Sequence, residues 1–364
     1  MILKELTTFL ESAVPLAYQE SYDNCGLIVG DPNMEIKGIL LCLDSTEAVV
    51  EEALQKGCNV VLAHHPILFS GLKRLTGSNY IERTLLKAIK HDVAIYAMHT
   101  NLDHVQAGVN AKIAEKLGLR NTRILAPKRG INRKLVTFVP HGDAEKVRQA
   151  IFKAGAGHIG NYSETSYNLQ GLGTFKAEAG ANPTIGEIGE RHQEPETRID
   201  TIFPAHLERQ VIQALIAAHP YEEAAYDIVP LENEEKTVGA GMIGDLAVPA
   251  DETAFLQTIK ESMRAKVLRY TPLRGKPIHK VAVCGGSGSF LLKDAIRAGA
   301  DIFITADLKY HQFFDAEGRI MIADIGHYES EQFTPEIFHS ILTEKFRNFV
   351  VIFSEINTNP INYF

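Results

Sequence analysis

Cysteine is scarce in this chain, with four residues among 364 and no C-x-x-C pair. This scarcity excludes a small disulfide-stabilised scaffold, and we interpret Cys25, Cys42, Cys58 and Cys284 as reduced thiols of a cytoplasmic protein. At roughly 150 residues per domain, the length predicts two or three folding units with sizeable cores.

The chain also lacks an excess of basic residues and any long apolar run. Lys and Arg number 37 against 45 Asp and Glu, a net charge of −8 that argues against nucleic-acid binding as the main function. No stretch approaches the ~20 apolar residues of a membrane span, and the N-terminus has no apolar signal-peptide core. We therefore expect neither membrane insertion nor export.

The first third of the sequence alternates apolar strand-like runs with helical patterns, which predicts a βαβαβ order and a parallel sheet flanked by helices. The expected elements are a strand over 38–43, a helix over 46–56, a strand over 59–63, a helix over 80–90 and a strand over 93–98.

The last third repeats this order, with strands over 280–284, 301–305 and 319–324 and a helix over 290–298. The two thirds align without a gap from Cys42 onto Cys284. Chance similarity between two βαβ units is the alternative. We predict an α/β fold in which residues 1–128 and 235–364 form two related lobes of one discontinuous metal-binding domain.

The middle third has a different pattern, typical of an inserted ferredoxin-like α+β domain over residues 129–234. Strands are expected over 135–139, 158–167, 197–203 and 224–229, and helices over 143–154 and 207–218. Residues 178–196 predict an exposed loop, and the clusters at 126–133 and 232–237 predict linkers.

Two adjacent histidines, His64 and His65, follow an apolar strand and precede Pro66. Neighbouring side chains on a strand point to opposite faces, so both can reach one site only where the strand ends. Sites in open α/β sheets lie at the carboxyl ends of parallel strands. This pair therefore favours a metal site over histidines that only cap structure.

His327 and Glu331 stand four residues apart, as do His99 and Asp103, a spacing that places two side chains on one helical face. The candidate metal ligands are therefore imidazoles and carboxylates, which suit zinc, iron, manganese or nickel better than calcium: His64, His65, Asp103, His327 and Glu331.

Five ligands exceed what one catalytic zinc ion needs, and they fit two divalent ions bridged by a carboxylate. Such a site stays electropositive and open to water and to an anionic substrate, so a metal-bound hydroxide is the expected nucleophile. His99 is a candidate for orienting a ligand, and Asp307 and His311 for assisting proton transfer.

Three further segments have both a functional and a structural interpretation. Residues 284–289, Cys-Gly-Gly-Ser-Gly-Ser, either bind an anion or pack a strand tightly against a helix, and they match neither common nucleotide-binding glycine motif. Residues 20–26 either line a pocket or form a surface turn, the latter being favoured. His219 and the next three residues predict a turn rather than a binding site.

Taken with their neighbours, these motifs resemble the NIF-three-like family, known in bacteria as GTP cyclohydrolase 1 type 2 homologues. The likeness runs almost from end to end. It is carried by Ser-Tyr-Asp-Asn-Cys-Gly-Leu at 21–27, Ala-His-His-Pro at 63–66, His-Thr-Asn-Leu-Asp at 99–103, Cys-Gly-Gly-Ser-Gly at 284–288 and Asp-x-x-His-x-x-x-Glu at 324–331.

The resemblance implies a di-metal centre with these five residues as ligands, a toroidal homohexamer and a CutA-like or PII-like insert. It also implies hydrolytic opening of the guanine ring of GTP, although a phosphoesterase acting on another phosphorylated small molecule would use the same centre. A metal-containing regulatory protein, whose insert senses a metabolite or partner, and a metal-handling protein are the competing interpretations.

Overall fold

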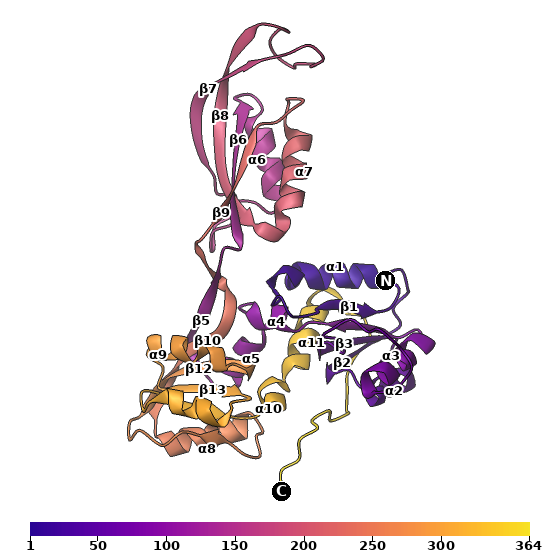
Figure 1. Cartoon of the computed structure of the whole chain (residues 1–364), viewed down its shortest axis with the longest axis vertical. Coiled ribbons are helices and arrows are strands. Elements are labelled where there is room, and N and C mark those ends of the chain that lie inside the picture. The colour runs from indigo at the N-terminus through magenta and orange to yellow at the C-terminus, as the bar shows by residue number, and fades with distance from the viewer. The chain divides into compact units, whose positions relative to one another are not determined.

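The computed structural model describes residues 1–364, which fold into two compact units. Unit 1 comprises Met1–Pro127 and Lys236–Phe364, and unit 2 comprises Lys128–Glu235. None of the helices combines the length and apolar character that crossing a bilayer requires. Figure 1 shows the elements of each unit.

The first sheet of unit 1 has the strand order β1-β4-β3-β2-β15. Strands β2, β3 and β4 are parallel, which confirms the predicted βαβαβ order, and β1 pairs antiparallel to β4. The strands are β1 (Gly26–Val29), β2 (Ile39–Asp44), β3 (Val60–His65), β4 (Ala94–Ala97) and β15 (Val351–Phe353), and the helices of this half are α1 (Leu3–Ala13), α2 (Glu47–Gln55), α3 (Tyr80–Lys90), α4 (Thr100–His104) and α5 (Val109–Lys116).

The second sheet of unit 1 has the order β11-β14-β13-β12-β10-β5, with β12, β13 and β14 parallel. Its strands are β5 (Arg120–Arg129), β10 (Glu234–Ala250), β11 (Arg269–Tyr270), β12 (Ile278–Ser287), β13 (Ile302–Ala306) and β14 (Met321–Asp324). The helices are α8 (Glu252–Ser262), α9 (Leu292–Arg297), α10 (His327–Glu331) and α11 (Thr334–Lys345).

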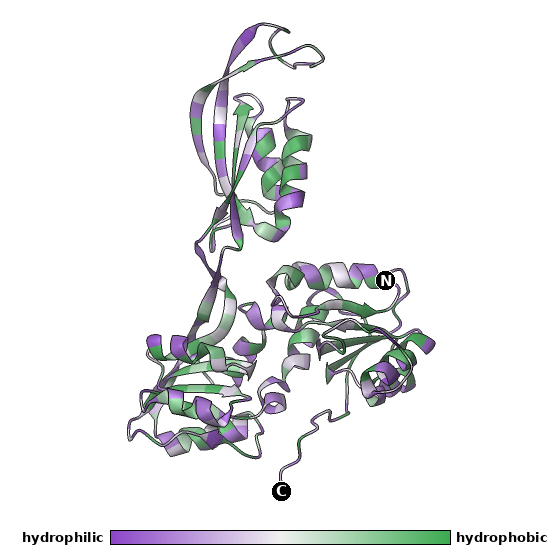
Figure 2. Ribbon diagram, viewed as in Figure 1, coloured by the Kyte–Doolittle hydropathy of each residue, from purple (hydrophilic) through white to green (hydrophobic).

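The main core of unit 1 draws on both sheets and on the helices between them. Leu41 of β2, Val283 of β12 and Phe338 of α11 belong to one cluster of buried apolar side chains. The central strands are hydrophobic along most of their length (Figure 2), as expected of parallel strands covered on both faces. This shared core fixes the carboxyl ends of the two sets of parallel strands.

Unit 2 contains one antiparallel sheet of order β7-β8-β6-β9 with both helices packed on one face. The elements are β6 (Asn132–Pro140), α6 (Ala144–Lys153), β7 (Tyr167–Lys176), β8 (Arg191–Pro204), α7 (Glu208–Ala218) and β9 (Tyr226–Leu231). Leu135 of β6 and Ile199 and Phe203 of β8 face the helices, so the residues that alternate with them along each strand face away.

Two expectations for this region are wrong. The strand predicted over 158–167 lies instead at β7, whose side chains are largely exposed and include Gly171 and Gly173, so no apolar alternation marks it. The loop predicted to reach residue 196 ends earlier because β8 begins at Arg191 and pairs with β7. The boundaries of the two units, at Pro127/Lys128 and Glu235/Lys236, lie inside the segments predicted as linkers, although these segments belong mostly to strands β5, β6 and β10.

Candidate metal centre

The candidate site begins where β3 ends. His64 and His65 are its last two residues, and their ring centroids lie 4.9 Å apart, so the strand end does bring both side chains to one place. His64 is completely buried, whereas His65 is partly exposed. Helix α4, which follows β4, supplies Asp103, and α10, which follows β14, supplies His327 and Glu331.

Glu331 lies at the centre of this cluster and is 3% exposed. Its Oε2 lies 2.9 Å from His65 Nε2 and 3.1 Å from His327 Nε2. Its Oε1 lies 3.7 Å from His64 Nε2. The two carboxylate oxygens thus face different histidines, and the structure divides the five predicted residues into two groups that share Glu331.

The first group comprises His65, His327 and Glu331, whose donor atoms lie within 4.8 Å of one another. The two histidine Nε2 atoms are only 3.3 Å apart and both approach the same carboxylate oxygen. Three donor atoms converging in this way can hold a cation.

The second group comprises His64, Asp103 and Glu331. His64 Nε2 and Asp103 Oδ1 are 3.8 Å apart, and both atoms are buried without a hydrogen-bond partner. An unpaired buried polar atom is costly and rare, so two that face each other need an explanation. A cation between them would satisfy both, and the residues present therefore fit a metal ion.

Each histidine is fixed by a hydrogen bond at its other ring nitrogen. Nδ1 of His64 lies 2.8 Å from the carbonyl oxygen of Met98. Nδ1 of His65 lies 2.7 Å from Asp44, and Nδ1 of His327 lies 2.6 Å from Asp307. Such partners set the tautomer that presents Nε2 to a metal.

The pKa values follow from these contacts. Burial lowers the pKa of His64 and so favours the neutral ring, and the hydrogen bond that Nδ1 donates to the Met98 carbonyl leaves Nε2 without a proton. Burial would also lower the pKa of His65, but hydrogen bonds to Asp44 and Glu331 raise it to about 10. Burial and the charge of Glu331 raise the pKa of Asp103. Burial disfavours ionised Glu331, but the charge on His327 lowers its pKa below the ordinary range.

His99 lies beside both groups, with its ring centroid 5.2 Å from that of His64 and 5.4 Å from that of His65. Its Nδ1 is 2.8 Å from Asp23, which also accepts a hydrogen bond from the Thr100 amide. Although burial disfavours its charge, hydrogen bonds to His99 and Thr100 lower the pKa of Asp23. Residues 20–26 therefore do more than form a surface turn, because Asp23 orients a histidine of the cluster.

The glycine-rich segment at 284–289 packs against the cluster. The amide of Gly285 donates to Asn110 and that of Gly286 to Ser330, so neither is free for an anion. Gly286 has φ +57°, and a Cβ there would lie 2.5 Å from Glu331 Oε1. Tight packing is thus the interpretation that the contacts favour.

The remaining residues singled out in the sequence either contact one of the candidate metal ligands or lie away from the cluster. Asp307 contacts His327, as described above, whereas exposed His311 packs against Tyr310 and Phe314. His219 lies in unit 2, where its Nε2 is 2.9 Å from the carbonyl oxygen of Phe138. Asp44 was not among the residues predicted from the sequence, although the parallel register that pairs it with His65 could have indicated it.

A family model matches nearly the whole sequence. The model of Duf34/NIF3 (NGG1p interacting factor 3) matches residues 1–360. The chain belongs to the Duf34/NIF3 family. The match extends over both units, and it confirms the resemblance seen in the sequence motifs.

Relatives in the Duf34/NIF3 family match over nearly their whole length. The "GTP cyclohydrolase 1 type 2 homolog" of Halalkalibacterium halodurans is 40% identical over 347 residues, covering 94% of this chain and 93% of the relative. The protein of the same name in Bacillus subtilis is 37% identical over 365 residues, covering 99% of this chain and 98% of the relative. The crystal structure of a Bacillus cereus protein related to NIF3 has a TM-score of 0.86 and 38% identity, covering 100% of this chain and 99% of that one. The mixed α/β architecture is therefore that of solved Duf34/NIF3 structures.

Proposed function

We propose that the protein is a di-metal-dependent hydrolase in which two divalent ions share Glu331. His65 and His327 would hold one ion and His64 and Asp103 the other. The observation that carries this proposal is the division of the Glu331 carboxylate, whose Oε2 faces His65 and His327 while Oε1 faces His64. The imidazole and carboxylate donors favour zinc, iron or manganese.

Two such ions, when bound, activate water for attack and stabilise negative charge that develops on the substrate. Asp44 and Asp307 hold His65 and His327 with Nε2 directed at Glu331. Asp23 holds His99 beside them. Asp103 and Glu331 offset only half of the charge of two divalent ions, so the centre attracts an anionic substrate.

We propose GTP or a related phosphorylated small molecule as the substrate. The printed name of the relatives, "GTP cyclohydrolase 1 type 2 homolog", supports hydrolytic opening of a guanine ring. Phosphoester hydrolysis is the alternative reaction for the same centre, because a bimetal site serves either reaction.

The sheet orders support two related lobes, residues 1–128 and 235–364. In the first sheet the antiparallel strand β1 precedes β4-β3-β2, and in the second the antiparallel strand β11 precedes β14-β13-β12. In unit 2 the order βαββαβ supports a CutA-like or PII-like ferredoxin-like insert over residues 129–234. We further propose a toroidal homohexamer in the cytoplasm, where four unpaired cysteines are stable.

A second candidate function is regulation, with the insert sensing a metabolite or partner. A cavity lined entirely by unit 2 favours it. Metal removal distinguishes the two functions. If the metal is catalytic, its removal abolishes only the activity, whereas if the metal is structural, as expected for a regulatory protein, its removal also dissociates the oligomer.

Product analysis tests the proposed function. The full-length protein, reconstituted separately with zinc, iron and manganese, is incubated with GTP and with a panel of phosphoesters, and the products are identified by mass spectrometry. Glu331→Gln is the blank. Formate release from GTP supports cyclohydrolase chemistry, and phosphate release supports a phosphoesterase. If neither formate nor phosphate is released above the level of the blank with any of the metals, the hydrolase proposal is contradicted and the regulatory function becomes the favoured one.

A further inference from the structure

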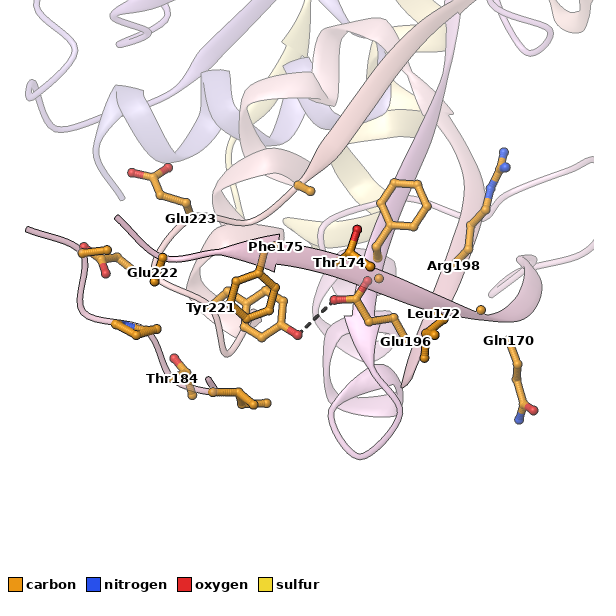
Figure 3. Close-up of a pocket in the computed structure, with 18 of the residues that line it drawn as sticks. Gln170, Leu172, Thr174, Phe175, Thr184, Glu196, Arg198, Tyr221, Glu222 and Glu223 are labelled. Carbon is orange, nitrogen blue, oxygen red and sulfur yellow. Dashed lines mark hydrogen bonds between the residues drawn. The ribbon is translucent and has the colours of Figure 1, made fainter. Parts of the chain in front are cut away.

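The face of the unit 2 sheet that the helices leave uncovered carries a cavity of about 670 Å³. Strands β7 and β8 form its floor, and the segments at 181–185 and 221–225 form its walls (Figure 3). Two contacts tie these walls together: the amide of Asn182 donates to Glu222, and the hydroxyl of Thr184 donates to the carbonyl of Pro220. The cavity is thus a built feature of unit 2.

Glu196 on β8 is the central polar group of this cavity. Its side chain accepts one hydrogen bond, from the Tyr221 hydroxyl at 2.9 Å, and no Lys, Arg or His pairs with it. The residue is only 9% exposed. A carboxylate so deeply buried normally has a cationic partner, because burial disfavours an isolated charge. Burial and Glu196 together raise the pKa of Tyr221, so this hydroxyl stays a neutral donor.

Glycines on β7 leave open the space beside this carboxylate. Gly171 stands directly opposite Glu196 in the β7–β8 register. At Gly173 a Cβ would lie 2.2 Å from Glu196 Oε2. The absence of side chains at these two positions keeps Oε2, the oxygen that Tyr221 does not bind, accessible along the cavity floor.

The charge of the lining is negative. Glu222 and Glu223 stand at the wall, and the one cationic side chain of the lining, Arg198, is already bound by two hydrogen bonds to Asp200. Figure 3 shows the guanidinium of Arg198 directed away from Glu196 and Tyr221. An anion would meet repulsion here, whereas a cation would gain a partner.

Aromatic and aliphatic groups complete the lining. The rings of Phe175 and Tyr221 have centroids 5.9 Å apart, and Leu169 and Leu172 extend the apolar part of the cavity. Aromatic faces near a carboxylate bind organic cations through cation–π attraction and apolar contact. A hydrated metal ion would use neither the rings nor the leucines.

We propose that this cavity binds a small organic cation, a protonated amine with an apolar or aromatic body. Its ammonium donates to Glu196 Oε2, and its body lies against Tyr221, Phe175 and the leucines. This site is separate from the candidate metal centre, all of whose residues belong to unit 1. The inference therefore does not depend on the proposed hydrolase function.

Calorimetric titration of the full-length protein with three probes of similar shape tests this proposal: 2-phenylethylammonium, neutral 2-phenylethanol and anionic 3-phenylpropionate. We expect the ammonium compound to bind at least tenfold more tightly than the other two. Glu196→Gln should abolish that preference, and Gly173→Ala should weaken ammonium binding by filling the space at Oε2. The exposed residue Glu190 offers a matched control, Glu190→Gln, which should bind as the wild type does.

Equal affinity for the ammonium compound and the alcohol would overturn the proposal, because the cavity would then be only an apolar groove. Absence of ammonium binding by the correctly folded wild-type protein would overturn it as well. So would an ammonium preference that persists in Glu196→Gln. Because Gly173→Ala leaves every charged group in place, it keeps the proposal testable if Glu196→Gln fails to fold.

Discussion

Oε2 of Glu331 lies 2.9 Å from Nε2 of His65, although 266 positions separate these residues in the sequence. The contact joins the end of a strand in the first sheet to a short helix after a strand of the second. Every element of the candidate metal centre is arranged around this junction. The chemistry that we propose therefore depends on both halves of unit 1 folding together.

Replacing Glu331 tests the shared carboxylate. Glu331→Gln removes the negative charge that faces His64, His65 and His327 at once, so we expect the purified variant to lose most of its bound metal. Elemental analysis by mass spectrometry gives the metal content per chain. His219→Ala, an alteration in unit 2, should leave that content unchanged. Equal metal content in wild type and Glu331→Gln would contradict the bridging role.

Two glycine substitutions separate backbone strain from loss of the site. Gly286 and Gly299 both have positive φ, +57° and +74°, so an alanine costs about 1–2 kcal/mol at either position. Only at Gly286 would the new Cβ meet Glu331 Oε1, whereas at Gly299 nothing lies within 4 Å. We expect both variants to be destabilised and only Gly286→Ala to lose metal. The same metal content in both would show that the contact with Glu331 is unimportant.

Asp44 and Asp307 provide a test of the division into two groups. Both carboxylates orient histidines of the group containing His65 and His327, and neither touches His64 or Asp103. Asp44→Asn and Asp307→Asn should each lower the affinity for the ion held by His65 and His327 by roughly 10–100-fold and leave the affinity for the other ion unchanged. Competition titrations with a chromophoric chelator resolve the two affinities. An equal loss of affinity for both ions would argue against a division of the ligands into two groups.

Glu82 links stability to pH. Its carboxylate accepts hydrogen bonds from the amides and hydroxyls of Thr76 and Ser78 and from the Asn79 side chain. Hydrogen bonds to the Ser78 and Thr76 amides are the main cause that lowers its pKa to about 2 from an ordinary 4.5. The folded-state pKa is depressed, so this stabilisation is complete above about pH 4.5 and is lost as the pH falls towards 2.

Glu82→Gln should therefore unfold at a lower urea concentration than wild type at about pH 7, and the difference should shrink as the pH is lowered to about 3. Far-ultraviolet circular dichroism follows the transition. The exposed Glu115 supplies the control, Glu115→Gln, which should track wild type throughout. A difference between Glu82→Gln and wild type that is independent of pH would contradict this account.

Local pattern in the sequence was enough to predict much of the candidate site. His64 and His65 are adjacent, and His327 and Glu331 are one helical turn apart, so each pair was visible without any knowledge of the fold. Glu331 faces the histidines of both groups because of the way the two sheets pack together. The spacing of residues along the sequence does not reveal this packing. Asp44 and the role of Asp23 were missed for the same reason, because the partner of Asp44 lies 21 positions away and that of Asp23 lies 76 positions away.

The fold was predictable where burial imposes a pattern. Apart from Asp44 at the end of β2 and the two histidines at the end of β3, the parallel strands β2, β3 and β4 are apolar, and they were found with small errors at their ends. Strand β7 was misplaced because its side chains are mostly exposed and its pairing with β8 alone keeps it extended. The upper parts of β7 and β8 in Figure 2 are largely hydrophilic, which is why the sequence there resembled a loop.

Anomalous diffraction from crystals of the metal-loaded protein, measured at the absorption edge of the bound metal, tests the central claim most directly. Our account predicts two peaks, one beside Oε2 of Glu331 near His65 and His327 and one beside Oε1 near His64 and Asp103. A single peak, or two peaks that do not both adjoin Glu331, would contradict it.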